Sequence, residues 1–175
     1  MSATAVVSTS VADTALAARL LYTEAAHIDA QAWDEWLAMY LPDSEFWVPA
    51  WKAEHQVTTN PKRELSLIYY ASRAGLEDRV WRVRSGKSVA SRPMPRTQHA
   101  VTNVLLESGG EAAGRLRVLS NWTVHQFLTK TRSTEVLYGR YEHDFVLQDG
   151  AWLIGRKKII VLNDALPGAL DFYSL

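Results

Sequence analysis

The sequence predicts an α+β domain in which helices pack on one face of a curved antiparallel sheet, so that the whole forms a cone. The first half of the chain shows amphipathic helical patterns, whereas residues 97–162 alternate between apolar and polar in the manner of long strands. Asp149-Gly150 is a hairpin signal between two of those strands. Helices followed by consecutive antiparallel strands are typical of α+β domains.

Length and composition indicate one globular domain. The chain has 175 residues, of which 47% are hydrophobic and 22% are charged, and a chain of this size buries roughly 70% of its unfolded surface. We expect residues 1–12 to form a flexible tail and residues 13–175 to form a single domain. The tail lacks the basic and apolar regions of a signal peptide, so a cytoplasmic location is expected.

Charge and cysteine content exclude several classes of function. Lys+Arg and Asp+Glu number 19 each, so no net field favours nucleic acid or an anionic membrane. Charged residues interrupt every apolar run before it could cross a bilayer. The chain has no cysteine, which excludes disulfides, thiolate catalysis and a cysteine-held iron–sulfur cluster within it.

Two helices are predicted after the tail. Asp13 or Thr14 can cap the first, and Asp29 can cap the second. Pro42 ends the second helix because it disfavours helical geometry at the preceding residue. The first has a stripe of Leu16, Leu20, Thr23 and His27, with Leu21 and Ile28 beside it, and the second has Trp33, Trp36, Leu37 and Tyr40 on one face. Trp33 and Trp36 are interpreted as buried packing residues, not as a platform for an aromatic ligand.

The middle of the chain is less regular. A short strand from Glu45 to Val48 leads into residues 49–64, which have no period and are predicted to be a functional loop, an interface arm or a mobile segment. A strand or buried helical turn follows from Leu65. A third helix is then predicted to run toward Gly86, which can cap its C-terminus, with an inward face of Leu76, Val80 and Val83.

Four strands are predicted to complete the sheet. Their ranges are 97–107, 114–128, 134–148 and 151–162. In the second of them, Leu116, Val118, Trp122, Val124 and Leu128 share one face.

No catalytic set is evident from the residues alone. His143 lies on an apolar face and its neighbour Asp144 points the opposite way, so the two cannot act as an acid–base pair. We interpret His143 as a hydrogen-bonded packing residue. The five histidines have neither the i, i+4 helical spacing nor the HxH spacing of a metal site.

Four segments carry a resemblance to a known family: DEWLAMYLPDSEFWVPAW, ELSLIYYASRAGLEDRVWRVRSG, PRTQHAVTNV and YGRYEHDFVLQDGAWLIGRKKIIVLNDALPGALDFY. In order and spacing they resemble the small (beta) subunit of Rieske-type aromatic ring-hydroxylating dioxygenases, above all the benzoate, halobenzoate and anthranilate branch. The likeness covers about residues 15–175. It implies a cone-shaped fold related to nuclear transport factor 2 and ketosteroid isomerase.

The resemblance implies a structural subunit with no catalytic, cofactor-binding or metal-binding residue of its own. A large alpha subunit would carry the Rieske [2Fe–2S] cluster and a mononuclear Fe(II), typically in an α3β3 hexamer. Electrons would come from NADH through a separate reductase, with or without a ferredoxin, acting on the alpha subunit. The assembly would hydroxylate an aromatic carboxylate and would need neither nucleic acid nor a membrane.

Several aromatic and apolar residues are then candidates to meet neighbouring subunits. They are Trp47, Trp51, His55, Leu170, Phe172 and Tyr173. They lie in stretches with no evident partner inside the domain, so we expect deletion of residues 170–175 to weaken assembly more than the isolated fold.

Two alternatives stay open at this point. The chain could be a stand-alone isomerase or dehydratase, with His143, Tyr141 and Asp34 as the best candidates for its pocket. It could also be a binding protein for a small ligand without catalysis.

Overall fold

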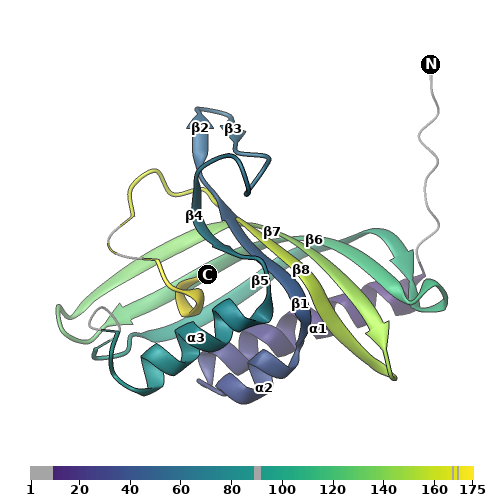
Figure 1. The fold of residues 1–175 in the computed structure, drawn as a ribbon, viewed down its shortest axis with the longest axis horizontal. Helices are drawn as coiled ribbons and strands as arrows, with labels where there is room; N and C mark the ends of the chain where they lie inside the picture. The colour runs from purple at the N-terminus through teal and green to yellow at the C-terminus, as the bar shows by residue number, and fades with distance from the viewer. Residues whose placement is uncertain (1–9, 89–91, 167, 169) are drawn as a thin grey trace.

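A computed structural model describes residues 10–88, 92–166, 168 and 170–175 of the chain, and it confirms the α+β cone (Figure 1). The elements follow in the order α1 (Val11–Asp29), α2 (Trp33–Ala38), β1 (Tyr40–Pro49), β2 (Trp51–Ala53), β3 (Gln56–Val57), β4 (Ser66–Tyr70), α3 (Arg73–Arg84), β5 (Arg96–Gly110), the 3₁₀ turn η2 (Glu111–Ala113), β6 (Arg115–Leu128), β7 (Ser133–Gln148), β8 (Ala151–Val161) and the 3₁₀ turn η3 (Phe172–Ser174).

The main sheet is mixed, which corrects the prediction of a purely antiparallel one. Its six strands lie in the order β4-β1-β8-β7-β6-β5. The antiparallel β5–β8 part is as predicted, with Asp149 and Gly150 at φ of 52° and 81° in the last hairpin. β1, however, runs parallel to β8, with Phe46 opposite Lys157. Alternation along one strand reveals its faces and not the direction of its neighbour.

The bounds of the first two helices differ from the prediction. Ser10 caps α1, and its Oγ accepts a hydrogen bond of 3.0 Å from the amide of Asp13, so the helix begins before residue 13. Residues 11 and 12 are therefore helical, and residues 1–9 of the expected tail lie outside the described part. α2 ends at Ala38, and Pro42 lies within β1 instead of ending a helix. The third helix ends near Gly86 (φ 70°), as predicted.

The buried stripe of α1 is offset from the predicted one. Its buried residues are Ala17, Leu21, Glu24 and Ile28. Of the predicted stripe, Leu16, Leu20 and His27 are only partly buried and Thr23 is exposed, because the helix is rotated so that Glu24 faces the sheet. Leu21 and Ile28, which were predicted beside that stripe, are buried. A charged residue at the centre of a buried stripe does not register in a pattern based on hydrophobicity.

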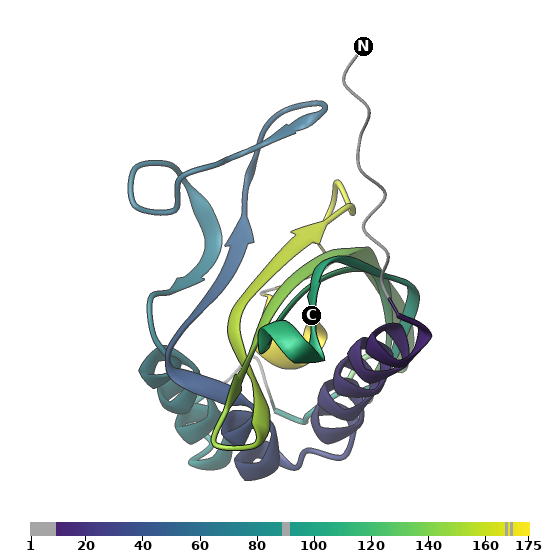
Figure 2. The same cartoon turned by 90° about the vertical axis from the view of Figure 1, so that its right-hand side faces the viewer.

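The irregular segment 49–64 holds a small hairpin. β2 and β3 form a separate two-stranded sheet that projects from the body of the domain (Figures 1 and 2). All three residues of β2 are exposed. An isolated two-stranded hairpin is only marginally stable in water, so this arm depends on its few contacts with the main sheet.

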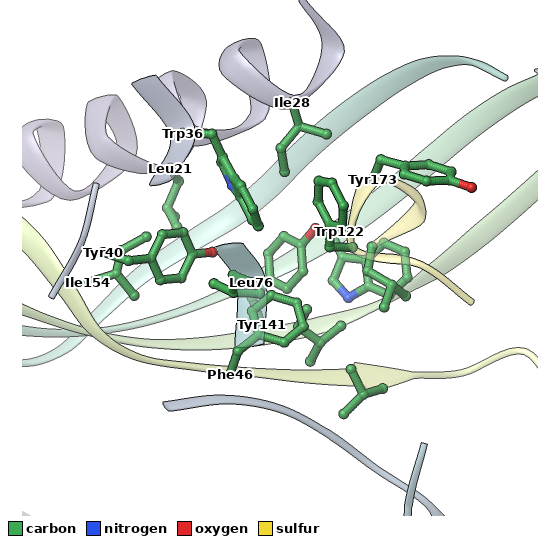
Figure 3. Close-up of a cluster of buried hydrophobic side chains, with 14 of the residues drawn as sticks. Leu21, Ile28, Trp36, Tyr40, Phe46, Leu76, Trp122, Tyr141, Ile154 and Tyr173 are labelled. Atoms are coloured by element: carbon green, nitrogen blue, oxygen red, sulfur yellow. The ribbon is translucent and has the colours of Figure 1, made fainter. Parts of the chain in front are cut away.

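The core fills the space between the sheet and the helices (Figure 3). Trp33 and Trp36 are buried in it, which confirms their interpretation as packing residues. The C-terminal turn η3 lies in the same space, between the sheet and α3 (Figure 1), and Phe172 stacks on Trp36 with ring centroids 4.8 Å apart.

Candidate functional site

A buried carboxylate inside the cone is contacted by polar groups from four other elements. Glu24 of α1 accepts hydrogen bonds from Tyr40 Oη at 2.5 Å and from Lys157 Nζ at 2.7 Å. His143 Nε2 lies 3.1 Å from the other carboxylate oxygen, and Trp36 Nε1 lies 3.4 Å from the first. The cluster links α1 to β1, β7, β8 and α2.

The surroundings set the ionisation of this cluster. Burial alone would raise the pKa of Glu24, but attraction to Lys157 and hydrogen bonding with His143 outweigh it and hold that pKa well below its ordinary value. Burial lowers the pKa of His143, which Glu24 only partly offsets, and it also lowers the pKa of Lys157. Glu24 is therefore ionised, and Lys157 and His143 are its hydrogen-bonding partners.

The cluster confirms His143 as a hydrogen-bonded packing residue. The sequence analysis missed its partners Glu24 and Lys157. The signal that could have found them is a charged side chain at an inward position: Glu24 follows Leu21 by three residues on α1, and Lys157 precedes Ile159 by two on β8. Asp144 faces away from His143 and pairs with Arg117 on the outer face, as expected.

A second polar group joins the end of α1 to β5. His99 Nδ1 lies 2.6 Å from Asp29 Oδ1, while the His99 amide donates to Oδ2 at 2.8 Å and Thr97 Oγ1 donates to Oδ1 at 2.9 Å. Burial would raise the pKa of Asp29, but the hydrogen bonds from His99 and Thr97 lower it below its ordinary value. Asp29 thus links the end of α1 to β5 through hydrogen bonds. It is not the predicted cap of α2, because the N-cap residue of that helix is Ala32, which makes no side-chain hydrogen bond.

This contact places a hydrogen on Nδ1 of His99, because an ionised carboxylate only accepts. The His99 side chain is 2% exposed, and Nε2 is buried without a hydrogen-bond partner among the described residues. The sequence pattern missed this pair because its members are 70 positions apart.

The residues proposed for a stand-alone enzyme do not form one site. The rings of Tyr141 and His143 are neighbours, with centroids 5.3 Å apart inside the cone. The Asp34 side chain is 75% exposed and makes a bidentate ion pair with Arg84 on the surface. A base at Asp34 therefore cannot act together with the buried pair.

The candidate interface residues divide into buried and exposed groups. Phe172 and Tyr173 are buried in the core and Leu170 packs against it, so the premise that they lack an internal partner is wrong. Trp51 is 38% exposed, with its Nε1 donating to the carbonyl of Val161 at 2.8 Å. The His55 side chain is almost fully exposed at the tip of the hairpin.

Trp47 is buried for a different reason. It lies opposite Lys158 in the β1–β8 register, on the face of the sheet away from the helices. Lys158 and Arg156 lie over its ring at 5.5 and 5.8 Å, and its Nε1 donates to Ser66 Oγ at 2.9 Å. These contacts leave Trp47 only 2% exposed, so the expectation that it lacks an internal partner is also wrong.

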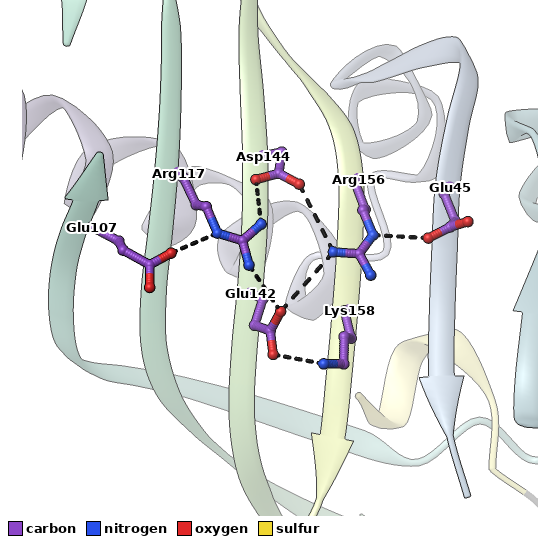
Figure 4. A network of polar contacts seen from close by, with 7 residues as sticks. All are labelled: Glu45, Glu107, Arg117, Glu142, Asp144, Arg156 and Lys158. Atoms are coloured by element: carbon purple, nitrogen blue, oxygen red, sulfur yellow. Dashed lines mark hydrogen bonds and ion pairs between the residues drawn. The ribbon is translucent and has the colours of Figure 1, made fainter. Parts of the chain in front are cut away.

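The outer face of the sheet carries an ion-pair network (Figure 4). Arg117 pairs with Glu107, Asp144 and Glu142, across β5, β6 and β7. The network continues through Lys158 and Arg156 to Glu45 on β1, with Lys158 Nζ 2.8 Å from Glu142 and Arg156 Nε 2.8 Å from Glu45. Each of these seven side chains has an oppositely charged partner within the network, which contains three cations and four carboxylates.

Among the residues that the structure describes, no group of three or more His, Cys, Asp or Glu side chains is placed to hold a metal ion. Within the same residues, no helix is long and apolar enough to cross a membrane.

Comparison with known proteins identifies the family. The model of the ring hydroxylating beta subunit family matches residues 23–168. The benzoate 1,2-dioxygenase subunit beta of Acinetobacter baylyi is 37% identical over 157 residues, which cover 90% of each chain. The anthranilate 1,2-dioxygenase small subunit of the same species is 35% identical over 156 residues, covering 89% of this chain and 93% of its own.

A solved structure agrees with these matches. The beta subunit of the benzoate 1,2-dioxygenase from Burkholderia mallei superposes with a TM-score of 0.75 at 32% identity, covering 96% of this chain and 99% of that one. The cone, the family model and the similarity along nearly the whole chain lead to one conclusion. The chain belongs to the ring hydroxylating beta subunit family.

Proposed function

We propose that this chain is the small subunit of a multicomponent dioxygenase that hydroxylates an aromatic carboxylate. The observation that carries the proposal is the 37% identity to a benzoate 1,2-dioxygenase subunit beta, which extends over 90% of both chains. Benzoate and anthranilate, named in two of the relatives, are both carboxylates on an aromatic ring. The chain thus supports the assembly, and the chemistry takes place on another subunit.

The division of labour follows from the ligands that the redox centres need. A Rieske cluster requires two cysteines and two histidines, and this chain has no cysteine. The Rieske cluster therefore needs another chain, and we assign it, together with the mononuclear Fe(II), to a large alpha subunit. We propose an α3β3 hexamer, with NADH supplying electrons to the large subunit through a separate reductase.

The hairpin arm is the part of the described surface best suited to meet a neighbour. Trp51 is exposed on it, His55 lies at its tip, and a crevice beside it is lined by Arg140 and Leu162. Aromatic residues at the centre of an interface contribute more than their share of binding energy. Leu170 is half-buried and offers less surface, so we assign the contact chiefly to Trp51 and His55.

The proposal is tested by co-expression with a cognate large subunit of the same dioxygenase. We expect one complex with equal numbers of both chains on size-exclusion chromatography with light scattering, and oxygenase activity toward benzoate when a reductase and NADH are supplied. Metal analysis of the isolated small subunit should find no stoichiometric iron. A chain that stays monomeric beside its partner and converts a small substrate alone would overturn the proposal.

A further inference from the structure

Arg140 is a cation on the outer face of the sheet without a carboxylate partner among the described residues. Its side chain is exposed and makes no hydrogen bond or ion pair with any residue that the structure describes. Its cross-strand neighbours, Asn121 on β6 and Ile160 on β8, are both uncharged. A guanidinium group stays protonated at every pH that a folded protein meets. Arg140 is therefore available to a carboxylate that comes from outside this chain.

The acidic groups of the ion-pair network nearby are already paired. In the row of residues next to Arg140, Glu142 on β7 lies opposite Lys158 on β8. Each oxygen of Glu142 has a cation of its own, since Lys158 Nζ lies 2.8 Å from Oε1 and Arg117 Nη2 lies 3.2 Å from Oε2 (Figure 4). Arg140 therefore differs from Arg117, Arg156 and Lys158, which all have carboxylate partners within the sheet.

Two hollows in the surface meet at Arg140. The first measures about 290 Å³ and lies over the sheet, where Leu105 and Ile160 are among its lining residues. The second measures about 510 Å³ and lies beside the hairpin arm, where Trp51 and Leu162 are among the lining residues. Because Arg140 lines both hollows, a segment of another protein lying across them would meet this cation between two apolar surfaces.

A β-bulge keeps the apolar wall of the first hollow exposed. Thr102 lies opposite Asn121 and Leu105 lies opposite Leu119, so β5 has one residue more than β6 between these two pairs. Asn103, within the bulge, has a φ of 52°, in the left-handed region that asparagine tolerates better than most residues. Thr102 and Leu105 consequently share the outer face, and Leu105 is 59% exposed.

The polar residues of the two hollows determine on which side of Arg140 a carboxylate is stable. Asn103 and Asn121 line the hollow over the sheet, and their amide groups can donate hydrogen bonds to it. Glu54 and Asp164 line the hollow beside the arm, where their negative charges would repel it. A carboxylate bound by Arg140 therefore belongs in the hollow over the sheet.

We propose that Arg140 binds an Asp or Glu side chain of the large subunit, carried on a segment that lies across β6, β7 and β8. This inference rests on the proposed function and names the chemistry of a contact beyond the hairpin arm. The planar guanidinium binds a carboxylate through two parallel hydrogen bonds, and an ammonium group does not reproduce this geometry. The exposed side chains of Leu105 and Trp51 supply the apolar part of the same interface.

The test measures the dissociation constant between the small and large subunits by dilution of a fluorescently labelled complex. Arg140→Gln should raise it at least about tenfold, which corresponds to about 1.4 kcal/mol. Arg140→Lys keeps the charge and loses the paired hydrogen bonds, so its dissociation constant should lie between those of the wild type and Arg140→Gln. Arg82→Gln is the matched control, because Arg82 on α3 is also exposed and has no ion pair among the described residues. It should change the constant by less than about twofold.

Salt and the isolated chain provide two further readouts. The wild-type dissociation constant should rise between about 50 and 500 mM NaCl, because salt screens an exposed ion pair, and the rise should be smaller for Arg140→Gln. Thermal melts of the isolated Arg140→Gln chain should coincide with those of the wild type, since Arg140 has no side-chain partner in the described part of the fold. Equal salt dependence of the two complexes would contradict an ion pair at Arg140.

The outcomes separate this inference from the proposed function. A wild-type chain that forms no complex with the large subunit would overturn both. A wild-type complex whose dissociation constant is the same with Arg140→Gln as with Arg82→Gln would overturn the role of Arg140 and leave the proposed function standing. Self-association of the isolated chain that is lost in Arg140→Gln, measured by light scattering, would assign this face to a second copy and also overturn the inference.

Discussion

Glu24 of α1 and Lys157 of β8 form an ion pair of 2.7 Å whose side chains are only 3% and 1% exposed. The pair crosses the interior of the cone and joins the helical layer to the sheet. Because burial removes both charges from water, each is stabilised by the other. The carboxylate of Glu24 is stabilised further by the hydroxyl of Tyr40 and the ring of His143.

Removing one charge of this pair should destabilise the fold strongly. Lys157→Met is expected to lower the free energy of unfolding by about 3–5 kcal/mol, because it leaves the carboxylate of Glu24 buried and unpaired. Glu24→Gln in the same chain should recover part of that loss, which a double-mutant cycle in urea measures. Arg84→Ala, which breaks the exposed pair with Asp34, is the control and should cost less than about 1 kcal/mol. Equal costs for the buried and the exposed pair would contradict this account.

Stability should fall as the solution becomes acidic, beginning with His143. Burial lowers the pKa of His143 in the folded chain, so below about pH 6.5 the unfolded chain binds the proton more readily and unfolding is favoured. The folded pKa of Glu24 lies below its ordinary value, so its contribution is present above about pH 4.3 and is lost on further acidification. Protonation of His143 and protonation of Glu24 therefore both lower the stability of the folded chain as the pH falls.

The measurement is the urea midpoint at each pH unit from 8 to 4. It should be flat near neutrality and fall below about pH 6.5. His143→Gln keeps an uncharged partner for Glu24 and should flatten the part of the decline between pH 7 and pH 5. A variant that declines as steeply as the wild type over this range would falsify the assignment to His143.

Trp36 and Trp81 provide a matched pair of tryptophans. Trp36 is fully buried against Phe172 and Tyr40, whereas Trp81 on α3 is 54% exposed. Trp36→Ala should cost about 3–5 kcal/mol of stability, and Trp81→Ala should stay within about 0.5 kcal/mol, as exposed substitutions do. Denaturant melts of the isolated chain measure both. A loss below about 0.5 kcal/mol for Trp36→Ala is incompatible with its burial.

Deletion of residues 170–175 should unfold or strongly destabilise the isolated chain. The loss of Phe172 alone is worth about 3–5 kcal/mol, and Leu175 is fully buried as well. This outcome replaces the expectation from the sequence that the deletion would affect assembly more than the fold. Thermal melts of the truncated chain measure it, with the exposed Leu65→Ala as control. A truncated chain as stable as the wild type would place η3 outside the core.

Trp51→Ala should weaken assembly and leave the fold intact. The ring is exposed on the hairpin arm and is held by one hydrogen bond to the carbonyl of Val161. Truncation of a central aromatic residue of an interface to alanine lowers the binding free energy by more than about 1–2 kcal/mol. Dilution of the co-expressed complex on size-exclusion chromatography should show earlier dissociation than in the wild type, while melts of the isolated chain coincide. Trp81→Ala serves as the control, and equal dissociation of the two variants would exclude Trp51 from the contact.

The sequence by itself determined the elements whose signals are local. The alternation of β6, the Asp149-Gly150 turn, the end of α3 near Gly86 and the burial of Trp33 and Trp36 all follow from neighbours within a few positions. The absence of cysteine, also a property of the sequence alone, excluded a Rieske cluster from this chain.

Only the tertiary structure decided which residues that are far apart in the sequence contact each other. Glu24 and Lys157 are 133 positions apart and Asp29 and His99 are 70 apart, and no period within a strand or helix relates them. The parallel pairing of β1 with β8 and the burial of Phe172 likewise depend on where distant segments meet. Hydrophobic patterning selects the face of an element, whereas its partner is selected by the packing of the whole core, in which charged groups are stable only where complementary groups converge.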